Sequence, residues 1–176
     1  MDINLILESL VAAISTIAFA SYYNAPRKTF MGSFLAGAIG WFLFKGLQVK
    51  LDTKILPAIV AGIAIGLIGE IFSKIAKEPV TVFIIPGILP LVPGAGMYRT
   101  MYNLVKENYD ISIYYGRESL LIAGAISFGL LIATVFSKSL KISKIRLKKL
   151  VYINLKIKIN LTNKKDGYEP SFFILQ

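Results

Sequence analysis

The sequence predicts an all-α integral membrane protein with four or five transmembrane helices, one of them broken by proline and glycine. Of the 176 residues, 55% are hydrophobic and only 17% are charged, whereas about a quarter of the residues of a soluble domain are charged. Up to Ser137, the charges lie singly or in small clusters between long apolar runs. One apolar run, Val80–Gly96, contains three prolines, which predicts the broken helix.

The first apolar run, Ile3–Tyr22, is long enough to cross a hydrocarbon core of about 30 Å. Glu8 interrupts it near its start. A cleavable signal peptide is the alternative, because Ala18–Ala20 resembles a cleavage site, but no Lys or Arg precedes the run. We therefore expect a retained span that ends at the turn containing Pro26.

The second and third runs, Phe30–Phe44 and Ile55–Ser73, carry small residues mostly at four-residue spacing. The second is short for a span unless Lys28 and Lys45 extend outward from its two ends. Small residues on one stripe predict close helix packing, although glycine is also simply common in membrane helices. These residues are Gly32, Ala36 and Gly40 in the second run, and Gly62, Gly66 and Gly69 in the third.

The run Val80–Gly96 is the most informative part of the sequence. Each interior proline removes a helical hydrogen bond and clashes with a carbonyl group. Non-helical backbone at membrane depth persists only where protein buries it or where it lines a wet cavity. We expect a broken helix that crosses the membrane, or a re-entrant hairpin, enclosed by the other helices. The residues expected to break the helix are Pro86, Gly87, Pro90 and Pro93.

An amphipathic segment follows, and the last predicted span is Glu118–Phe136. We divide the chain into a transmembrane domain, residues 1–137, and a basic tail, residues 138–176. The tail carries ten Lys and Arg and a net charge of +8, which predicts a cytoplasmic C-terminus. The tail could bind anionic lipid, but we favour a solvated extension whose charge fixes the topology. Alternating apolar residues within 155–161 predict a short strand.

Several classes of function are excluded by composition. The chain has no Cys and no His, so it offers no thiolate or imidazole ligand for a metal and no usual general base. We expect no enzyme activity, no metal and no cofactor. The net charge of +10 leaves only +2 outside the tail, so the transmembrane domain is not a nucleic-acid binder.

The segment Ile85–Met101 reads IPGILPLVPGAGMYRTM and resembles the signature of the threonine/serine exporter family. The resemblance covers residues 1–137, and the basic tail departs from it. More narrowly, it resembles the small membrane subunit that corresponds to the C-terminal half of single-chain exporters. It implies a split transporter in the cytoplasmic or inner membrane, working with a larger subunit of the same family. The implied solutes are small carboxylate-bearing metabolites: threonine, serine or dicarboxylates.

The broken helix suggests how such a solute is bound. A half-helix N-terminus presents unpaired N–H groups and a positive dipole end to an anion. We expect the amides of Gly94, Ala95 and Gly96 to bind the solute carboxylate, with Tyr98 and Arg99 adding contacts. The alternative is that proline and glycine only bend the segment for packing, and that Arg99 is an interfacial charge.

Glu70, near the end of the third run, is a candidate proton-coupling group, since a carboxylate inside the membrane is by default a functional candidate. The simpler interpretation is an interfacial ion pair with Lys74, which lies four residues later on the same helix face. A different function for the whole chain is also open. It could be an accessory subunit that assembles with a larger partner and binds no solute itself.

Overall fold

The structure is a computed structural model that describes the backbone of residues 3–165 and the side chains of residues 3–137 and 139. The chain divides into two compact units, Met1–Ser137 and Lys138–Gln176. The first unit contains every helix except the C-terminal part of the last one, and it is described below. The charged side chains of the basic tail lie outside the described residues.

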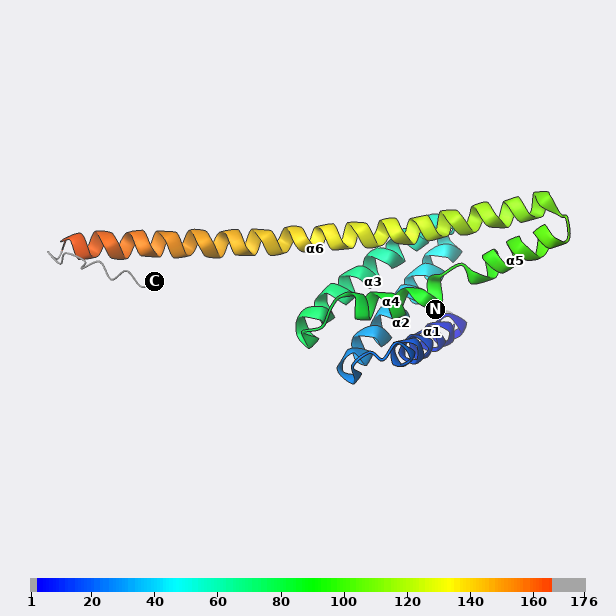
Figure 1. The fold of residues 1–176 in the computed structure, drawn as a ribbon, viewed down its shortest axis with the longest axis horizontal. Helices are drawn as coiled ribbons and strands as arrows, with labels where there is room; N and C mark the ends of the chain where they lie inside the picture. Colours follow the sequence, from blue (N-terminus) through cyan, green and yellow to red (C-terminus); the bar gives the residue numbers. More distant parts are fainter. Residues whose placement is uncertain (1–2, 166–176) are drawn as a thin grey trace. The chain divides into compact units, whose positions relative to one another are not determined.

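The first unit is a bundle of α-helices joined by short turns (Figure 1). The first three helices are consecutive in the chain and antiparallel to their neighbours: α1 (Ile3–Tyr22), α2 (Phe30–Leu51) and α3 (Ile55–Ala76). A short 3₁₀ turn, η1 (Arg27–Thr29), leads into α2. The final helix, α6 (Tyr109–Lys165), begins in this unit and continues into the second.

Between α3 and α6 the chain forms a bent pair of shorter helices. Helix α4 (Thr81–Ile88) passes into a 3₁₀ turn, η2 (Leu89–Leu91), and then into α5 (Gly94–Val105). The two arms are bent by 52°. Among the described residues, four helical segments are long and apolar enough to cross a membrane, and the bent pair would make a fifth. The predicted fold class is confirmed.

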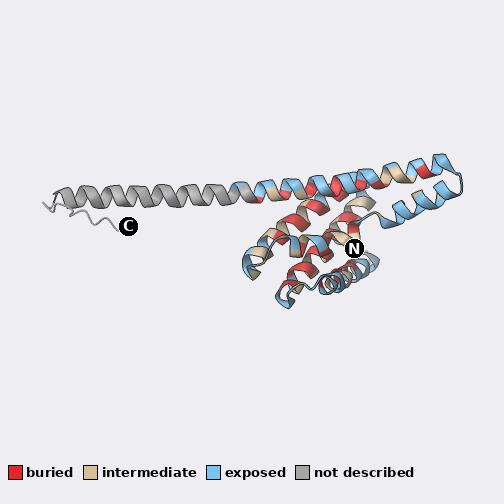
Figure 2. Cartoon of the chain, viewed as in Figure 1, coloured by how far each residue is buried: buried red, intermediate tan, exposed pale blue. Residues whose placement is uncertain are grey.

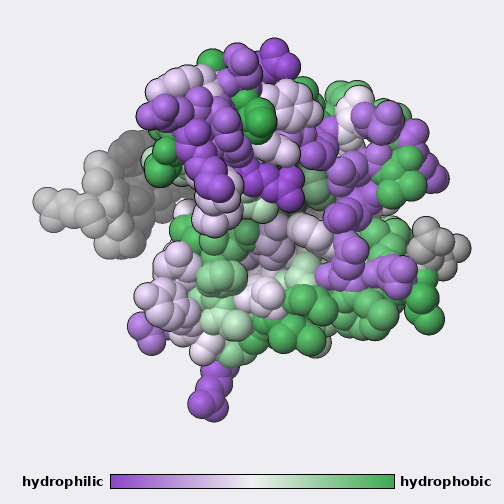
Figure 3. All heavy atoms as spheres, turned by 90° about the vertical axis from the view of Figure 1, so that its right-hand side faces the viewer, coloured by the Kyte–Doolittle hydropathy of each residue, from purple (hydrophilic) through white to green (hydrophobic). Residues whose placement is uncertain are grey.

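The core is built from small residues and a few large side chains. Ala36 of α2 and Ala58, Ala61 and Ile65 of α3 are fully buried and belong to one hydrophobic cluster, which also includes residues of η2 and α6. Phe83 of α4 is also fully buried. Elsewhere the outer surface of the helices is apolar and exposed, as expected for helices that face lipid. Figure 3 shows hydrophilic side chains gathered over the α5–α6 turn, with hydrophobic side chains over the elements below it.

The predicted close packing through small residues is confirmed. A Cβ atom added to Gly32 would lie 2.7 Å from the Phe83 ring. A Cβ atom added to Gly40 would lie 2.6 Å from the Ile65 side chain. Gly62, in contrast, packs against α6, where an added Cβ would lie 2.7 Å from the carbonyl oxygen of Ile126. The small residues of α2 and α3 therefore do not all face each other, since part of the stripe of α3 is used by α6.

Two expectations were wrong. The second span does not stop at Phe44, because α2 continues to Leu51 and places Lys45 inside the helix. The residues 155–161 form no strand, because α6 runs through them to Lys165. Extending an existing helix adds one hydrogen bond for each residue fixed and needs no new nucleus. A strand would need a neighbouring strand to pair with, and the described residues contain none.

Candidate functional site

The break between α4 and α5 lies over Leu89–Pro93. Pro86 is inside α4 and does not end it, and Gly87 packs there, with an added Cβ meeting Ala36 and Ile65 at 3.1 Å. Pro90 occupies the first turn of η2, and its fixed φ suits that position. Pro93, at φ −76° and ψ 54°, is the residue from which α5 starts.

Two backbone amides at the start of α5 have no backbone acceptor among the described residues. The N–H of Gly94 donates to the carbonyl oxygen of Val92 at 2.7 Å, and the N–H of Met97 donates to Pro93 at 3.1 Å. The amides of Ala95 and Gly96 lie between these two and make no such bond. The positive end of the helix dipole adds to their preference for an anion.

The two glycines at this N-terminus have different surroundings. A Cβ atom on Gly94 would meet nothing within 4 Å. A Cβ atom on Gly96 would overlap the hydroxyl oxygen of Ser119 on α6. Gly94 is therefore open to a solute, while Gly96 is needed for the approach of α5 to α6.

Tyr98 and Arg99 are directed along α5 and toward α6. The ring of Tyr98 stacks on Tyr102, with 6.1 Å between centroids. The guanidinium group of Arg99 lies 5.3 Å from the centre of the Tyr115 ring, a cation–π distance. The structure thus places five predicted residues, Gly94 to Gly96, Tyr98 and Arg99, within the first two turns of one helix.

Helix α5 is the most open element of this unit. None of its residues is buried, and Figure 2 shows it as exposed along most of its length. Besides the contacts of Gly96 and Arg99, it meets α6 at Thr100: Ser112 donates a hydrogen bond to the carbonyl oxygen of Thr100 at 2.8 Å, and Gly116 faces the Thr100 methyl group. The start of α5 is therefore reachable from outside the chain.

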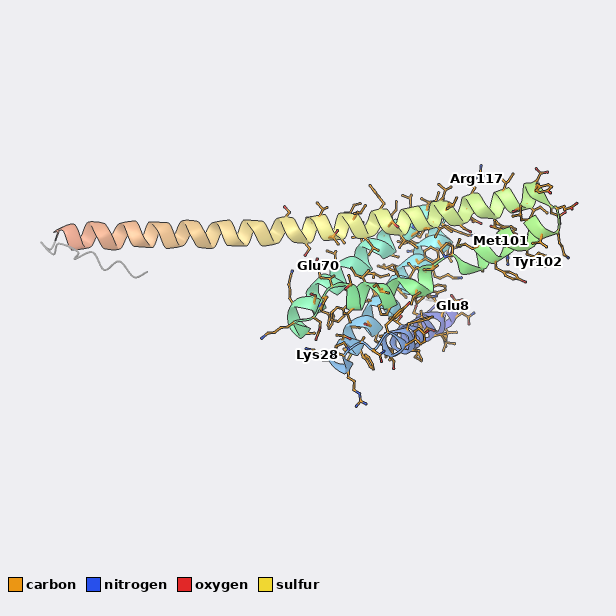
Figure 4. All side chains as sticks on the ribbon, in the orientation of Figure 1. Glu8, Lys28, Glu70, Met101, Tyr102 and Arg117 are labelled. Carbon is orange, nitrogen blue, oxygen red and sulfur yellow. The ribbon has the colours of Figure 1, made fainter. Side chains whose placement is uncertain are left out.

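Glu70 lies on α3, six residues before its end, and is half-buried. The predicted ion pair with Lys74 is not formed: in the described part of the chain the ion pairs are Lys28–Glu78, Lys45–Glu8 and Lys54–Glu118. Figure 4 shows Glu70 and Glu8 well apart, on different helices. The described residues also contain no group of three acidic side chains that could hold a metal ion.

The structure adds a charged cluster that sequence reasoning missed. The indole N–H of Trp41 donates to a carboxylate oxygen of Glu8 at 3.2 Å, and the ammonium group of Lys45 lies 3.6 Å from the same oxygen. Lys45 also lies 5.7 Å from the centre of the Trp41 ring. A hollow of about 400 Å³ beside the cluster is lined by Glu8, Trp41 and Pro90, so the cluster adjoins the helix break.

The sequence does contain a signal for this cluster. Glu8 lies five residues after the start of α1, and Lys45 lies six residues before the end of α2. Two antiparallel helices joined by a short turn bring such positions to a similar depth. The pairing was missed because the second span was expected to end before Lys45.

A family model described as "Threonine/Serine exporter, ThrE" matches residues 8–136. The chain belongs to the threonine/serine exporter family. The match includes the helix break and the whole of α5, so the resemblance seen at Ile85–Met101 is confirmed. No solved structure matches the chain.

Membership of this exporter family makes the chain a multi-pass membrane protein of a transporter family. The solutes that the family name gives, threonine and serine, carry a carboxylate and an ammonium group. Both charges must be stabilised inside a membrane, where an isolated charge is costly. In the described part of the chain, unpaired N–H groups lie at the start of α5, and charged groups of both signs lie in the Glu8–Lys45 cluster.

Proposed function

We propose that this chain is one subunit of a two-component membrane exporter of small carboxylate-bearing metabolites, either threonine and serine or dicarboxylates. An ion gradient drives the export. The single observation that carries the proposal is the broken span, in which α5 starts with two unpaired amides after Pro93. A discontinuous helix of this kind is a recurring way of binding an anionic solute inside a membrane.

In this proposal, the solute carboxylate accepts hydrogen bonds from the amides of Ala95 and Gly96. Gly94 leaves room for the solute to approach the backbone. Tyr98 and Arg99 contribute from the following turn. Glu70, a half-buried carboxylate of α3 without an ion-pair partner in the described structure, is the proposed proton-coupling group.

The open surface of α5 supports the need for a larger partner subunit of the same family. The helix carries Arg99 and Asn103 among its apolar residues and Lys106 directly after its end, yet none of its residues is buried against its own chain. Polar groups in a membrane need protein or water around them. A second membrane subunit that covers α5 would supply this and would close the solute site.

The same observation supports the second candidate function, that of an accessory subunit. If a partner covers α5 completely, the amides at its start would meet protein and not a solute. The two functions differ in what reaches Gly94, which has no neighbour within 4 Å. In an exporter this position is wet and binds solute, whereas in an accessory subunit it is dry.

We place the chain in the cytoplasmic membrane, or inner membrane, with the basic tail on the cytoplasmic side. The tail carries most of the net positive charge, and positively charged segments next to a span are retained in the cytoplasm. In a five-span arrangement the start of α1 and the α2–α3 turn then face outward.

The proposal is tested by measuring efflux. Cells that express this chain, the candidate larger subunit, or both are loaded with labelled threonine or succinate. Efflux that needs both chains supports a split exporter. If both chains are in the membrane and copurify but neither solute leaves the cells, the proposal fails for these solutes and the accessory function is favoured.

A further inference from the structure

A second, larger hollow lies at the turn between α2 and α3. It has a volume of about 630 Å³ and is open on one side to the surroundings. Its wall includes side chains from α2, the turn and α6. Its polar and charged lining residues are Lys45, Gln48, Asp52, Thr53, Lys54, Tyr114 and Glu118.

The turn holds its shape through a left-handed residue. Asp52 ends α2 with φ 49° and ψ 25°, and its N–H donates to the carbonyl oxygen of Gln48 at 3.1 Å. This conformation is tolerated by Asp and Asn more readily than by most residues. It allows the chain to reverse within Asp52–Lys54, so that all three residues line the hollow.

The two lysines of the hollow differ in how well their charge is neutralised. The ammonium group of Lys54 lies 2.7 Å from a carboxylate oxygen of Glu118, the distance of a direct charge-assisted hydrogen bond. The ammonium group of Lys45 lies 3.6 Å from Glu8, which is too long for such a bond. Lys45 also lines the hollow, with its side chain 36% exposed. Lys45 is therefore the cation that is able to accept another carboxylate.

We propose that this hollow is a binding site for the solute, and that Lys45 binds the solute carboxylate there. The choice of solutes rests on the proposed export function. Lys45 lines this hollow, and its partner Glu8 lines the smaller hollow described above, together with Trp41 and Pro90. A carboxylate arriving at Lys45 replaces Glu8 as its closest anion.

Asp52 also lines the hollow and forms no ion pair among the described residues. It follows Lys45 by seven residues, a helical rise of about 10 Å, whereas the carboxylate and the ammonium group of one amino acid share a single carbon atom. Lys45 is also directed away from Asp52, toward Trp41 and Glu8. Asp52 therefore does not share one small solute with Lys45.

The absence of cysteine from the chain makes a direct test simple. Thr53→Cys places a single thiol in the wall of the hollow, and Lys50→Cys places one on the exposed end of α2 outside it. Each variant, in membranes that also contain the larger subunit, is labelled with a water-soluble maleimide, with and without threonine or succinate. We expect solute to slow the labelling of Thr53→Cys severalfold and to leave Lys50→Cys unchanged.

The role of Lys45 is tested by adding Lys45→Gln to the Thr53→Cys variant. With Lys45→Gln, we expect protection of the thiol to need about tenfold more solute or to disappear. Lys45→Arg keeps the positive charge and should restore part of the protection. Lys50→Gln, which removes the same charge from the same helix outside the hollow, should leave the protection intact.

The outcomes separate this inference from the export function. Normal efflux together with no protection of Thr53→Cys by either solute would overturn the binding site and leave the exporter standing. Equal protection in Lys45→Gln and Lys50→Gln would overturn the role of Lys45. Protection that depends on Lys45 in cells without efflux would support the site, although the export function would then have failed.

Discussion

Gly94 and Gly96 stand two residues apart, but only one of them tests the solute site cleanly. Gly94→Ala adds a methyl group where the chain has no neighbour within 4 Å, so the stability of the protein should not change. If the amides of α5 bind the solute, the methyl group narrows the approach to them. We expect efflux to fall severalfold at unchanged expression and unchanged melting temperature. Normal efflux in Gly94→Ala and in the bulkier Gly94→Val would argue that the solute does not approach the start of α5.

Gly96→Ala should act through packing, because its methyl group would overlap the hydroxyl group of Ser119. The hydroxyl group can rotate away but then loses its hydrogen bond to the Tyr115 carbonyl oxygen, which is 2.8 Å long. We expect a loss of about 1 kcal/mol in stability, seen as a melting temperature lower by about 2–4 °C. Adding Ser119→Ala should restore most of it, since the remaining Cβ atom would lie at 3.5 Å. A double variant no more stable than Gly96→Ala would contradict this explanation.

Glu70 offers a test of ion coupling. Glu70→Gln keeps the size and hydrogen-bonding capacity of the side chain but cannot exchange a proton. If Glu70 couples transport to protons, efflux from the variant should no longer respond to an imposed pH gradient. Efflux is measured at several external pH values, with Lys74→Gln as a control on the same helix face. An unaltered pH response in Glu70→Gln would remove the coupling role.

Much of the candidate site could be predicted from the sequence, but its pairings could not. The proline and glycine spacing at Pro86–Gly96 located the helix break, because backbone rules apply locally whatever the surroundings. The contact of Gly96 with Ser119 joins residues 23 positions apart and depends on how α5 lies against α6. The Glu8–Lys45 pair depends likewise on the register of α1 against α2. The sequence shows such residues but not their partners.

At the scale of elements, α3 and α6 approach each other closely. A Cβ atom on Gly129 would overlap the carbonyl oxygen of Ile59, and it would lie 3.2 Å from the Cα atom of Gly62. The two backbones are thus in contact with no side chain between them. This is the packing that small residues allow in membranes. The sequence showed the glycines of α3, but hydropathy gives no information on which neighbour they face.

Gly129→Ala should therefore be more damaging than Gly96→Ala, because backbone atoms cannot rotate out of the way. We expect a loss of about 1–3 kcal/mol and a melting temperature in detergent lower by several degrees, or a loss of folded protein. Gly124→Ala adds the same methyl group to α6 at a position with no neighbour within 4 Å. It should melt at the same temperature as the natural chain, and equal destabilisation by both variants would contradict the close crossing.

At the scale of the whole molecule, the family match and the first compact unit end at nearly the same place, at residues 136 and 137. We expect a chain ending at Ser137 to keep its helical bundle and its efflux activity when it is expressed with the larger subunit. Loss of the tail should instead reduce the fraction inserted in the correct orientation, because the tail carries a net charge of +8. Transport and orientation are measured in the same cells. Transport is measured as efflux, and orientation by labelling Thr53→Cys from either side of the membrane. Loss of efflux with correct insertion would give the tail a direct role in transport.

Two of the ion pairs have a consequence for the transport cycle as a whole. Lys28–Glu78 joins the α1–α2 turn to the α3–α4 turn at one end of α3, and Lys54–Glu118 joins the other end of α3 to α6. Alternating access requires one end of a transporter to open while the other stays shut. Ion pairs with partly exposed side chains stabilise a protein by only about 0–1 kcal/mol each. Thermal motion can therefore break the ion pair at either end of α3. Dissolved salt screens such pairs, so salt added on one side of the membrane should loosen the pair on that side and favour the form that opens there.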